Sequence, residues 1–167
     1  MAVLKIRQFG DPVLRQKSAA ISRIDQKIKD LVKDMADTMY EAEGLGLAAV
    51  QIGILQQVIV TDISGEGKDL RALVNPEIIE AHGEQVEEEG CLSVPGFKVP
   101  VKRAMTVKVK GIDLKSGDEI VVEAEDWFSR ALQHEIDHLQ GILIIDRASK
   151  EDRARILKEL AIGHLGG

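Results

Sequence analysis

The chain has 167 residues and a mass of 18.3 kDa, a size that suits one compact domain. Its net charge of −6 and its pI of about 5.3 argue against binding to the phosphate backbone of nucleic acids, which needs a basic face. Aromatic residues make up only 3% of the chain, so broad stacking surfaces for single-stranded nucleic acids are not expected. No apolar run approaches the roughly 20 residues of a membrane-spanning helix. We therefore expect one domain over residues 1–167 that binds neither membranes nor specific nucleic-acid sequences.

The cysteine content and the N-terminal residues indicate the compartment. Cys91 is the only cysteine, so an intramolecular disulfide cannot form, and an unpaired thiol suits a reducing compartment. Residues 1–10 contain neither the apolar stretch of a signal peptide nor a Ser/Arg-rich transit segment. We expect a cytoplasmic protein.

The predicted elements begin with a short helix after the turn at residues 10–12, with Asp11 as its N-cap and Pro12 at its first position. A longer amphipathic helix is predicted over residues 25–42, ending before Gly44. Its apolar face is formed by residues at helical spacing, namely Ile28, Leu31, Val32, Met35 and Met39.

Strands are predicted in the middle of the chain. Residues 57–61 and 70–74 are β-branched or aliphatic runs, residues 105–110 alternate between apolar and polar, and residues 119–123 follow a hairpin turn at 115–118. Asp126 is predicted to cap a further helix that ends before Gly141, and a last helix is predicted over about residues 149–162. Strands grouped between flanking helices indicate an α+β fold and not an alternating βαβ sheet.

The most informative segment is QHEIDHLQG at residues 133–141, which contains the pattern HExxH. On a helix, His134 and His138 lie one turn apart on the same face, so both imidazoles can bind one metal ion. Glu135 would lie beside the open coordination position, where a carboxylate can take a proton from water and pass it to a leaving amine. Asp137 has two interpretations, a solvated helix charge and a partner of the metal ligands, and the sequence does not choose between them.

A third ligand is expected, because catalytic sites of this kind usually have three protein ligands. The long HExxHxxGxxH form is excluded, since Ile144 stands where its third histidine would fall. Glu159 lies at a workable separation for a glutamate ligand. Cys91, in the segment EEGCLS, is the other candidate because a thiolate binds divalent transition metals strongly, although a lone cysteine is often only a small buried residue. The residues alone leave both candidates open.

A third segment is GLGLAAVQ at residues 44–51. It is a poor nucleotide-binding loop, because it lacks a third glycine and follows a helix where a strand is needed. Its two glycines and two alanines indicate backbone that another chain can approach closely. Gln51 ends the segment with a neutral amide that could donate a hydrogen bond to an oxyanion.

Together and in this order, the three segments resemble peptide deformylase. The family pattern of GxGxAAxQ, EGCxS and QHExDHLxG is intact here as GLGLAAVQ, EGCLS and QHEIDHLQG. The flanking segments GDPVL at 10–14 and LVNP at 73–76 extend the resemblance over nearly the whole chain. The resemblance implies an α+β fold in which antiparallel strands pack around a central helix that carries HExxH, with an N-terminal and a C-terminal helix.

The resemblance also implies a reaction and a cofactor. The chain would be a bacterial-type enzyme that removes the N-formyl group from newly synthesised proteins beginning with formyl-methionine, releasing formate. One divalent ion per chain would be held by Cys91, His134 and His138. Fe²⁺ is the ion expected natively, while Zn²⁺, Ni²⁺ or Co²⁺ could replace it, and ligand type does not separate Fe²⁺ from Zn²⁺.

The catalytic roles follow from the same resemblance. Hydroxide formed at the ion attacks the formyl carbon, and Glu135 acts as general base and then as general acid. The oxyanion would be held by the ion, by the side-chain amide of Gln51 and by the backbone N–H of Leu92.

Substrate binding is expected to occur through the backbone. The resemblance implies that the peptide binds as an added strand. One side of it would pair with the backbone of Leu45 and Gly46, and the other with residues 88–90, which include Glu89 and Gly90. The methionine side chain needs an apolar pocket, for which the candidate walls are Leu92, Trp127, Arg130, Ala131 and His134. A surface charge for Arg130 and a core aromatic for Trp127 are equally good interpretations, and Lys98 is expected to be solvated.

Two alternatives remain at this point. The first is a zinc endopeptidase that uses Glu159 as its third ligand, and the second is a non-catalytic relative that binds N-termini. Intact Glu135 and Gln51 argue against the second, because a binding module needs neither a base nor an oxyanion donor. The mixed charges of the last helix indicate a solvated face, and docking on the ribosome near the exit tunnel is a weaker implication of the resemblance.

Overall fold

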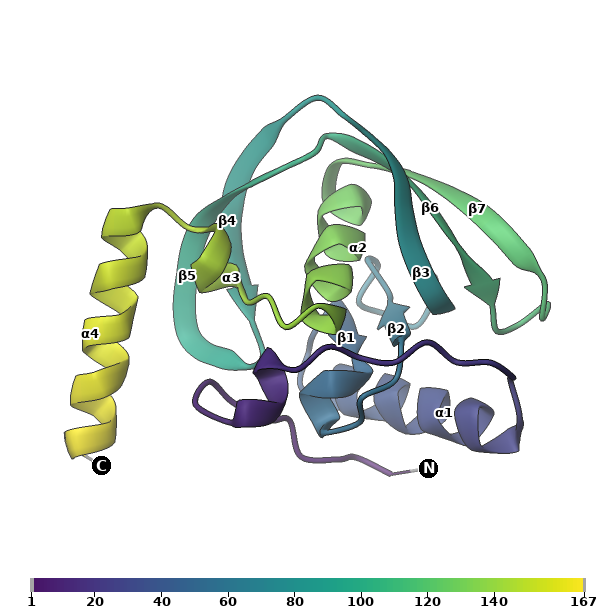
Figure 1. Ribbon diagram of the computed structural model, residues 1–167, viewed down its shortest axis with the longest axis horizontal. Coiled ribbons are helices and arrows are strands. Elements are labelled where there is room, and N and C mark those ends of the chain that lie inside the picture. The colour runs from purple at the N-terminus through teal and green to yellow at the C-terminus, as the bar shows by residue number, and fades with distance from the viewer. Residues whose placement is uncertain (1, 167) are drawn as a thin grey trace.

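The computed structural model describes residues 2–166, with side chains described through Ile162. Helix α2 (Asp126–Leu139) lies at the centre, between a five-stranded sheet and a two-stranded hairpin (Figure 1). This arrangement confirms the α+β fold class with antiparallel strands around a central helix.

The five-stranded sheet has the order β1-β2-β3-β6-β7, and every neighbouring pair is antiparallel. Its strands are β1 (Gly46–Ala48), β2 (Val58–Thr61), β3 (Arg71–His82), β6 (Thr106–Asp113) and β7 (Glu119–Glu125). In β6 the buried Val107 and Val109 alternate with Lys108 and Lys110, as the period of a half-buried strand requires. The three-residue strand β1 forms one edge of the sheet.

Strand β3 is longer than the predicted run over residues 70–74. It continues to His82 through Asn75 and Pro76, where Asn75 has φ +54° and the register with β6 shifts between Val74 and Glu77. The Asn-Pro pair therefore marks a β-bulge in a continuous strand, not the strand end that its composition suggests.

The hairpin consists of β4 (Gln85–Cys91) and β5 (Val94–Arg103), which pair along their length. No strand was predicted here, because the β4 segment is mostly exposed and acidic and the β5 segment contains two prolines. Its buried positions still alternate at Val99, Val101 and Arg103. The hairpin turn, Leu92 and Ser93, directly follows Cys91, so the turn geometry fixes where the thiol lies.

The first two helices each begin after an aspartate that caps them. The 3₁₀ helix η1 (Pro12–Arg15) begins after Asp11, whose side chain accepts a hydrogen bond from the Val13 N–H at 3.0 Å. Helix α1 (Gln26–Glu41) begins after Asp25, which accepts from the Ile28 N–H at 3.2 Å. A second 3₁₀ helix, η2 (Ala49–Ile52), follows β1 directly.

The start of α2 differs from the prediction. Asp126 is not the N-cap but the first helical residue, with φ +52°, and Glu125 precedes it without a side-chain capping bond. Tertiary hydrogen bonds hold this turn instead, because the Asp126 N–H donates to the Met105 carbonyl at 3.0 Å and the Asp126 carbonyl accepts from Gln85 Nε2 at 2.9 Å. The predicted end is confirmed, since Gly141 follows the helix with φ +77°.

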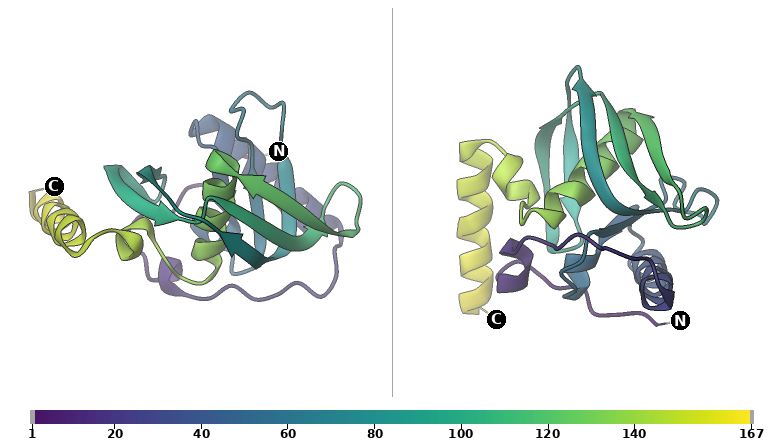
Figure 2. Two further views of the ribbon diagram at one scale, coloured as in Figure 1. Left: turned by 90° about the horizontal axis from the view of Figure 1, so that it is seen from above. Right: turned by 45° about the vertical axis from the view of Figure 1, so that its right-hand side comes forward.

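The C-terminal residues form two helices where one was predicted over residues 149–162. The one-turn helix α3 (Ile144–Arg147) is followed by α4 (Lys150–Gly166), and Ser149 Oγ accepts from the Asp152 N–H at 3.1 Å. Helix α4 stands outside the hairpin, away from α2 (Figure 2). Within residues 2–166, no helix combines the length and apolar character that a membrane crossing requires.

The buried apolar side chains of residues 2–162 form three clusters. One lies between α1 and the β1–β2 end of the sheet, the second between α2 and the sheet, and the third between the hairpin, η1 and the C-terminal helices. The second and third clusters hold α2 and the hairpin on opposite sides of the candidate site, so the position of that site is set by packing.

Candidate metal centre and active site

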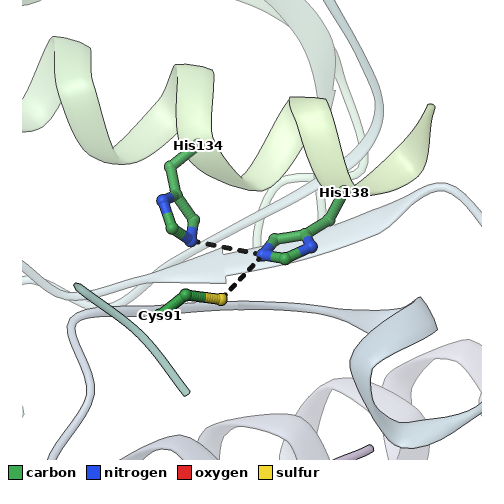
Figure 3. Close-up of side chains that lie close together, drawn as sticks. All are labelled: Cys91, His134 and His138. Carbon is green, nitrogen blue, oxygen red and sulfur yellow. Dashed lines mark hydrogen bonds between the residues drawn. The ribbon is translucent and has the colours of Figure 1, made fainter. Parts of the chain in front are cut away.

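Three metal-ligating side chains meet where the hairpin turn approaches α2. His134 and His138 lie one turn apart on the helix, with their Nε2 atoms 3.2 Å apart, and Cys91 Sγ lies 3.4 Å from His138 Nε2. Figure 3 shows the three side chains pointing toward one another. All three ligand atoms lie within 4.8 Å of one another, so this group could hold a metal ion.

The electrostatic setting differs between the two histidines. Burial lowers the pKa of the His138 imidazole well below its ordinary value, and the nearby His134 adds to this effect. Burial acts in the same direction at His134, but the negative charge of Glu135 and hydrogen bonds to Cys91 and Glu89 outweigh it and raise its pKa well above the ordinary value. One sulfur and two imidazole nitrogens are also a donor set that Zn²⁺ and Fe²⁺ accept.

Glu159, the alternative third ligand, is not part of this group. It lies on α4, its side chain is 51% exposed, and its carboxylate is 3.9 Å from Arg155. The structure therefore contradicts the ligand set on which the endopeptidase alternative depends.

Glu135 lies between the two histidines in sequence and is buried, with 4% of its surface exposed. Its Oε1 has no hydrogen-bond partner among the described residues. Burial raises the pKa of this carboxyl to about 7, even though the neighbouring His134 lowers it. A carboxyl with a pKa near neutrality is suited to accept and return a proton.

Strand β1 runs against this carboxylate. A Cβ atom on Gly46 would lie only 2.4 Å from Glu135 Oε2, so only glycine allows the backbone to pass this close. The preceding Leu45 is 48% exposed. The start of β1 therefore presents bare backbone beside the candidate base.

Gln51, on η2, is buried and its amide orientation is fixed by hydrogen bonds. Its Oε1 accepts from the Ala48 N–H at 2.9 Å, and its Nε2 donates to Ser93 Oγ at 3.1 Å. The same Nε2 lies 3.9 Å from Cys91 Sγ. The amide N–H groups are thus directed toward the hairpin turn that contains Leu92, whose side chain packs over Gly44.

A buried ionic network, which the sequence interpretation missed except for Asp137, lies behind His134. The guanidinium of Arg103 contacts both oxygens of Glu89 at 3.0–3.3 Å and also donates to Asp137. Glu89 Oε1 lies 3.5 Å from His134 Nδ1 and 3.5 Å from Arg130 Nη1. The alternation of Val99, Val101 and Arg103 was the signal that could have predicted an inward-facing arginine.

These contacts and exposures each exclude one interpretation of Asp137, Arg130 and Trp127. Asp137 is an ion-pair partner inside the protein and not a solvated helix charge. Arg130 is buried, with 2% exposed, so it is not a surface charge, and Trp127 is 57% exposed, so it is not a core aromatic. Lys98 is exposed, as expected.

The predicted substrate-binding residues lie at two strand edges and on α2. Leu45 and Gly46 belong to the β1 side and Glu89 and Gly90 to β4, and within residues 2–166 neither β1 nor β4 has a second strand partner. The Glu89 side chain is occupied by arginines, so only its backbone could pair with a peptide. Ala131 is half-buried on α2.

Comparisons with known proteins agree over nearly the whole chain. A family model described as polypeptide deformylase matches residues 3–154. A peptide deformylase from Halothermothrix orenii is 52% identical over 147 residues, which are 88% of this chain and 94% of that protein. The crystal structure of a peptide deformylase from Legionella pneumophila is similar with a TM-score of 0.91 and 41% identity, covering 98% of this chain and 96% of that one. A peptide deformylase from Synechococcus elongatus, solved in complex with actinonin, gives a TM-score of 0.89 and 37% identity over 95% of this chain and 88% of that one. The chain therefore belongs to the polypeptide deformylase family.

Proposed function

We propose that this member of the family hydrolyses the N-formyl group of newly synthesised proteins that begin with formyl-methionine, releasing formate and a free N-terminus. One observation carries the proposal: the buried carboxyl of Glu135, with its pKa raised to about 7, lies next in sequence to one ligand of the Cys91, His134 and His138 group. A metal-ligand group with an adjacent general base is the set of catalytic groups that metal-assisted amide hydrolysis requires.

Cys91, His134 and His138 would hold one divalent ion per chain. When bound, the ion would polarise the carbonyl group and lower the pKa of a water molecule. We expect Fe²⁺ natively, with Zn²⁺, Ni²⁺ or Co²⁺ able to replace it, since the donor set does not separate these ions.

Glu135 performs the proton transfers. Its carboxylate accepts a proton from the attacking water, and the resulting acid returns that proton to the leaving α-amine. The absence of a hydrogen-bond partner at Oε1 among the described residues supports this role, because no protein donor competes with the transferred proton for this oxygen.

Gln51 and Leu92 stabilise the developing negative charge. The Oε1 bond from the Ala48 N–H and the Nε2 bond to Ser93 hold the Gln51 amide beside Cys91, so an N–H donor lies next to the ligand group and can turn to an oxyanion that forms there. The backbone N–H of Leu92, in the hairpin turn, is the second donor. Fixed donors of this kind are worth more in a buried site than in water.

The substrate peptide pairs with the free edges of β1 and β4. Main-chain hydrogen bonds ignore side chains, which suits an enzyme that processes many different nascent proteins. The methionine side chain is expected to lie beside Leu92, Ala131 and His134. The Leu45 to Gly46 and Glu89 to Gly90 backbones are the pairing segments.

We further propose that residues 1–167 form one catalytic domain that acts in the cytoplasm. Cys91 is a half-buried free thiol, and an unpaired thiol suits a reducing compartment. Docking of α4 on the ribosome stays a prediction, supported only by the exposed arginines of that helix, Arg153 and Arg155.

Formate release from a formyl-methionyl tripeptide by anaerobically purified protein tests the reaction. Two matched variants test the ligand set: Cys91→Ser is expected to lose tight metal binding and most activity, and Glu159→Gln is expected to keep both. Cleavage of an internal peptide bond, or no formate release from protein that holds one ion per chain, would overturn the proposal.

A further inference from the structure

A chain of ion pairs connects the surface of the protein with the candidate metal ligands. Its centre is Arg103, whose side chain is 4% exposed and contacts Glu89 through Nε and Nη2 and Asp137 through Nη1. A buried guanidinium is costly unless its donors are satisfied, and here two carboxylates satisfy them.

The two carboxylates lie beside the two parts of the ligand group. Glu89 precedes Cys91 by two residues on β4 and contacts His134, while Asp137 precedes His138 on α2. Arg103 therefore bridges the hairpin and the helix that supply the ligands. Its bonds help to set the distance between the thiol and the imidazoles.

Arg147, from α3, holds the outer end of this chain. It contacts Asp137 through two parallel bonds, Nη2 to Oδ1 at 2.9 Å and Nε to Oδ2 at 3.1 Å. The Asp137 side chain is 13% exposed, whereas the Arg147 side chain is 46% exposed. A cleft of about 300 Å³ lies here, lined by Gln133, Asp137, Arg147 and residues of the hairpin and the β3–β4 turn, so Asp137 could turn toward water if Arg147 were lost.

We propose that Arg147 is a positioning residue for the metal centre. It holds Asp137 in the orientation that fixes Arg103, and Arg103 in turn fixes Glu89 against His134. Ligands oriented by outer partners bind their metal more tightly, because the ordering is completed before the ion arrives. The inference rests on the proposed role of Cys91, His134 and His138 as metal ligands.

An ordinary surface ion pair would behave differently. Exposed pairs contribute little to stability and have no reason to affect a distant metal site. Arg153 provides the matched comparison, because its side chain is 52% exposed, lies in the same C-terminal segment and is 3.9 Å from Asp146, outside the ion-pair chain.

The test is the dissociation constant for Co²⁺, measured by chelator competition on metal-free protein. We expect Arg147→Met to weaken Co²⁺ binding roughly tenfold, the lower end of the effect seen for partners of metal ligands. Arg153→Met is expected to bind as the wild type does. The urea midpoint of each metal-free variant should stay close to that of the wild type, which separates positioning from loss of folding.

A double-mutant cycle gives the second readout. Asp137→Asn keeps the shape of the side chain and removes its charge, so it should also weaken Co²⁺ binding. The double variant should lose no more Co²⁺ affinity than Asp137→Asn alone, because both changes interrupt the same series of ion pairs. Fully additive losses, or Arg147→Met binding as tightly as Arg153→Met, would overturn the inference.

Failure of the inference and failure of the proposed function give different results. If Cys91→Ser bound Co²⁺ as tightly as the wild type, the proposed ligand group would be wrong. If Cys91→Ser lost Co²⁺ while Arg147→Met kept it, the ligand group would stand and only the positioning role would fall.

Discussion

Helices α1 and α2 are both amphipathic, similar in length and packed against the same sheet, yet they bury different chemistry. The buried face of α1 is apolar apart from Thr38. The buried face of α2 contains Ser129, Arg130, Glu135 and His138 beside two leucines. Apolar burial stabilises a fold, whereas buried polar groups cost free energy unless they are paired. The comparison indicates that α1 is a helix for stability and α2 a helix for chemistry.

Glu135→Gln tests the chemical side of this comparison and has the largest expected effect. The variant keeps the shape of the side chain but cannot accept the proton, so kcat/KM for formate release should fall about 10²–10⁴-fold. Its free energy of unfolding should stay the same or increase, because a carboxyl whose pKa is raised by burial is replaced by a neutral amide. A variant with a near wild-type rate would remove Glu135 from the mechanism.

Gly46→Ala tests the close approach of β1 to α2. The new methyl group would lie 2.4 Å from Glu135 Oε2, so either the carboxylate or the strand must move. Displacement of this size is expected to lower kcat/KM on the order of 10²-fold. Gly90→Ala on the opposite strand is the comparison. Its new Cβ would meet atoms no closer than 3.6 Å, so the loss of kcat/KM should be smaller. Equal effects would show that the contact with Glu135 is not the cause.

Met35→Ala tests the stability side. Met35 is fully buried on α1, and its truncation removes apolar contacts and leaves a cavity. The free energy of unfolding, measured in urea, should fall by about 2–5 kcal/mol. The kcat of the folded protein, measured well below its melting temperature, should stay close to that of the wild type. A large loss of kcat in fully folded protein would contradict the division between the two helices.

The polar end of α1 gives the pH-dependent test. Asp62 is buried and accepts hydrogen bonds from Tyr40 at 2.6 Å and from the Ser64 N–H at 3.0 Å. Burial raises its pKa, but the bonds from Ser64 and Tyr40 outweigh burial and hold the pKa below its ordinary value of 3.8. Its stabilising contribution is therefore present above pH 3.8 and is lost as the pH falls through the lowered pKa.

Urea unfolding at a series of acidic pH values measures this contribution. The wild type should lose unfolding free energy more steeply below about pH 4 than Asp62→Asn, whose amide does not titrate. Parallel curves for the two proteins would show that Asp62 does not contribute to the acid sensitivity.

The features that were predictable from the sequence were those with a local signal. The periodic apolar face of α1 and the cap at Asp11 needed only neighbouring residues, and both are confirmed. HExxH placed His134 and His138 together because helical spacing is fixed. The position of Cys91 could not be predicted from its neighbours, because it depends on a hairpin turn that no local pattern indicated.

Features that depend on distant partners were missed. Arg103 is buried only because Glu89 and Asp137 come from other elements to satisfy it, and arginine is usually exposed. Asp126 has the residue type of a helix cap, but the Met105 carbonyl, in the β5–β6 connection, and Gln85, on β4, fix that turn. The acidic β4 carries few apolar residues because most of its surface faces solvent, so its strand character came from pairing with β5.

The free edges of β1 and β4 have a consequence for self-association. A strand edge of the kind that we propose for the substrate backbone could equally accept a strand from another copy of the chain, which is a common route to aggregation. Here β1 is only three residues long, and β4 carries the exposed carboxylates of Glu87 and Glu88. Short length limits the number of intermolecular hydrogen bonds, and like charges repel a second β4. Both features lower the tendency of these edges to pair with a second copy of the chain.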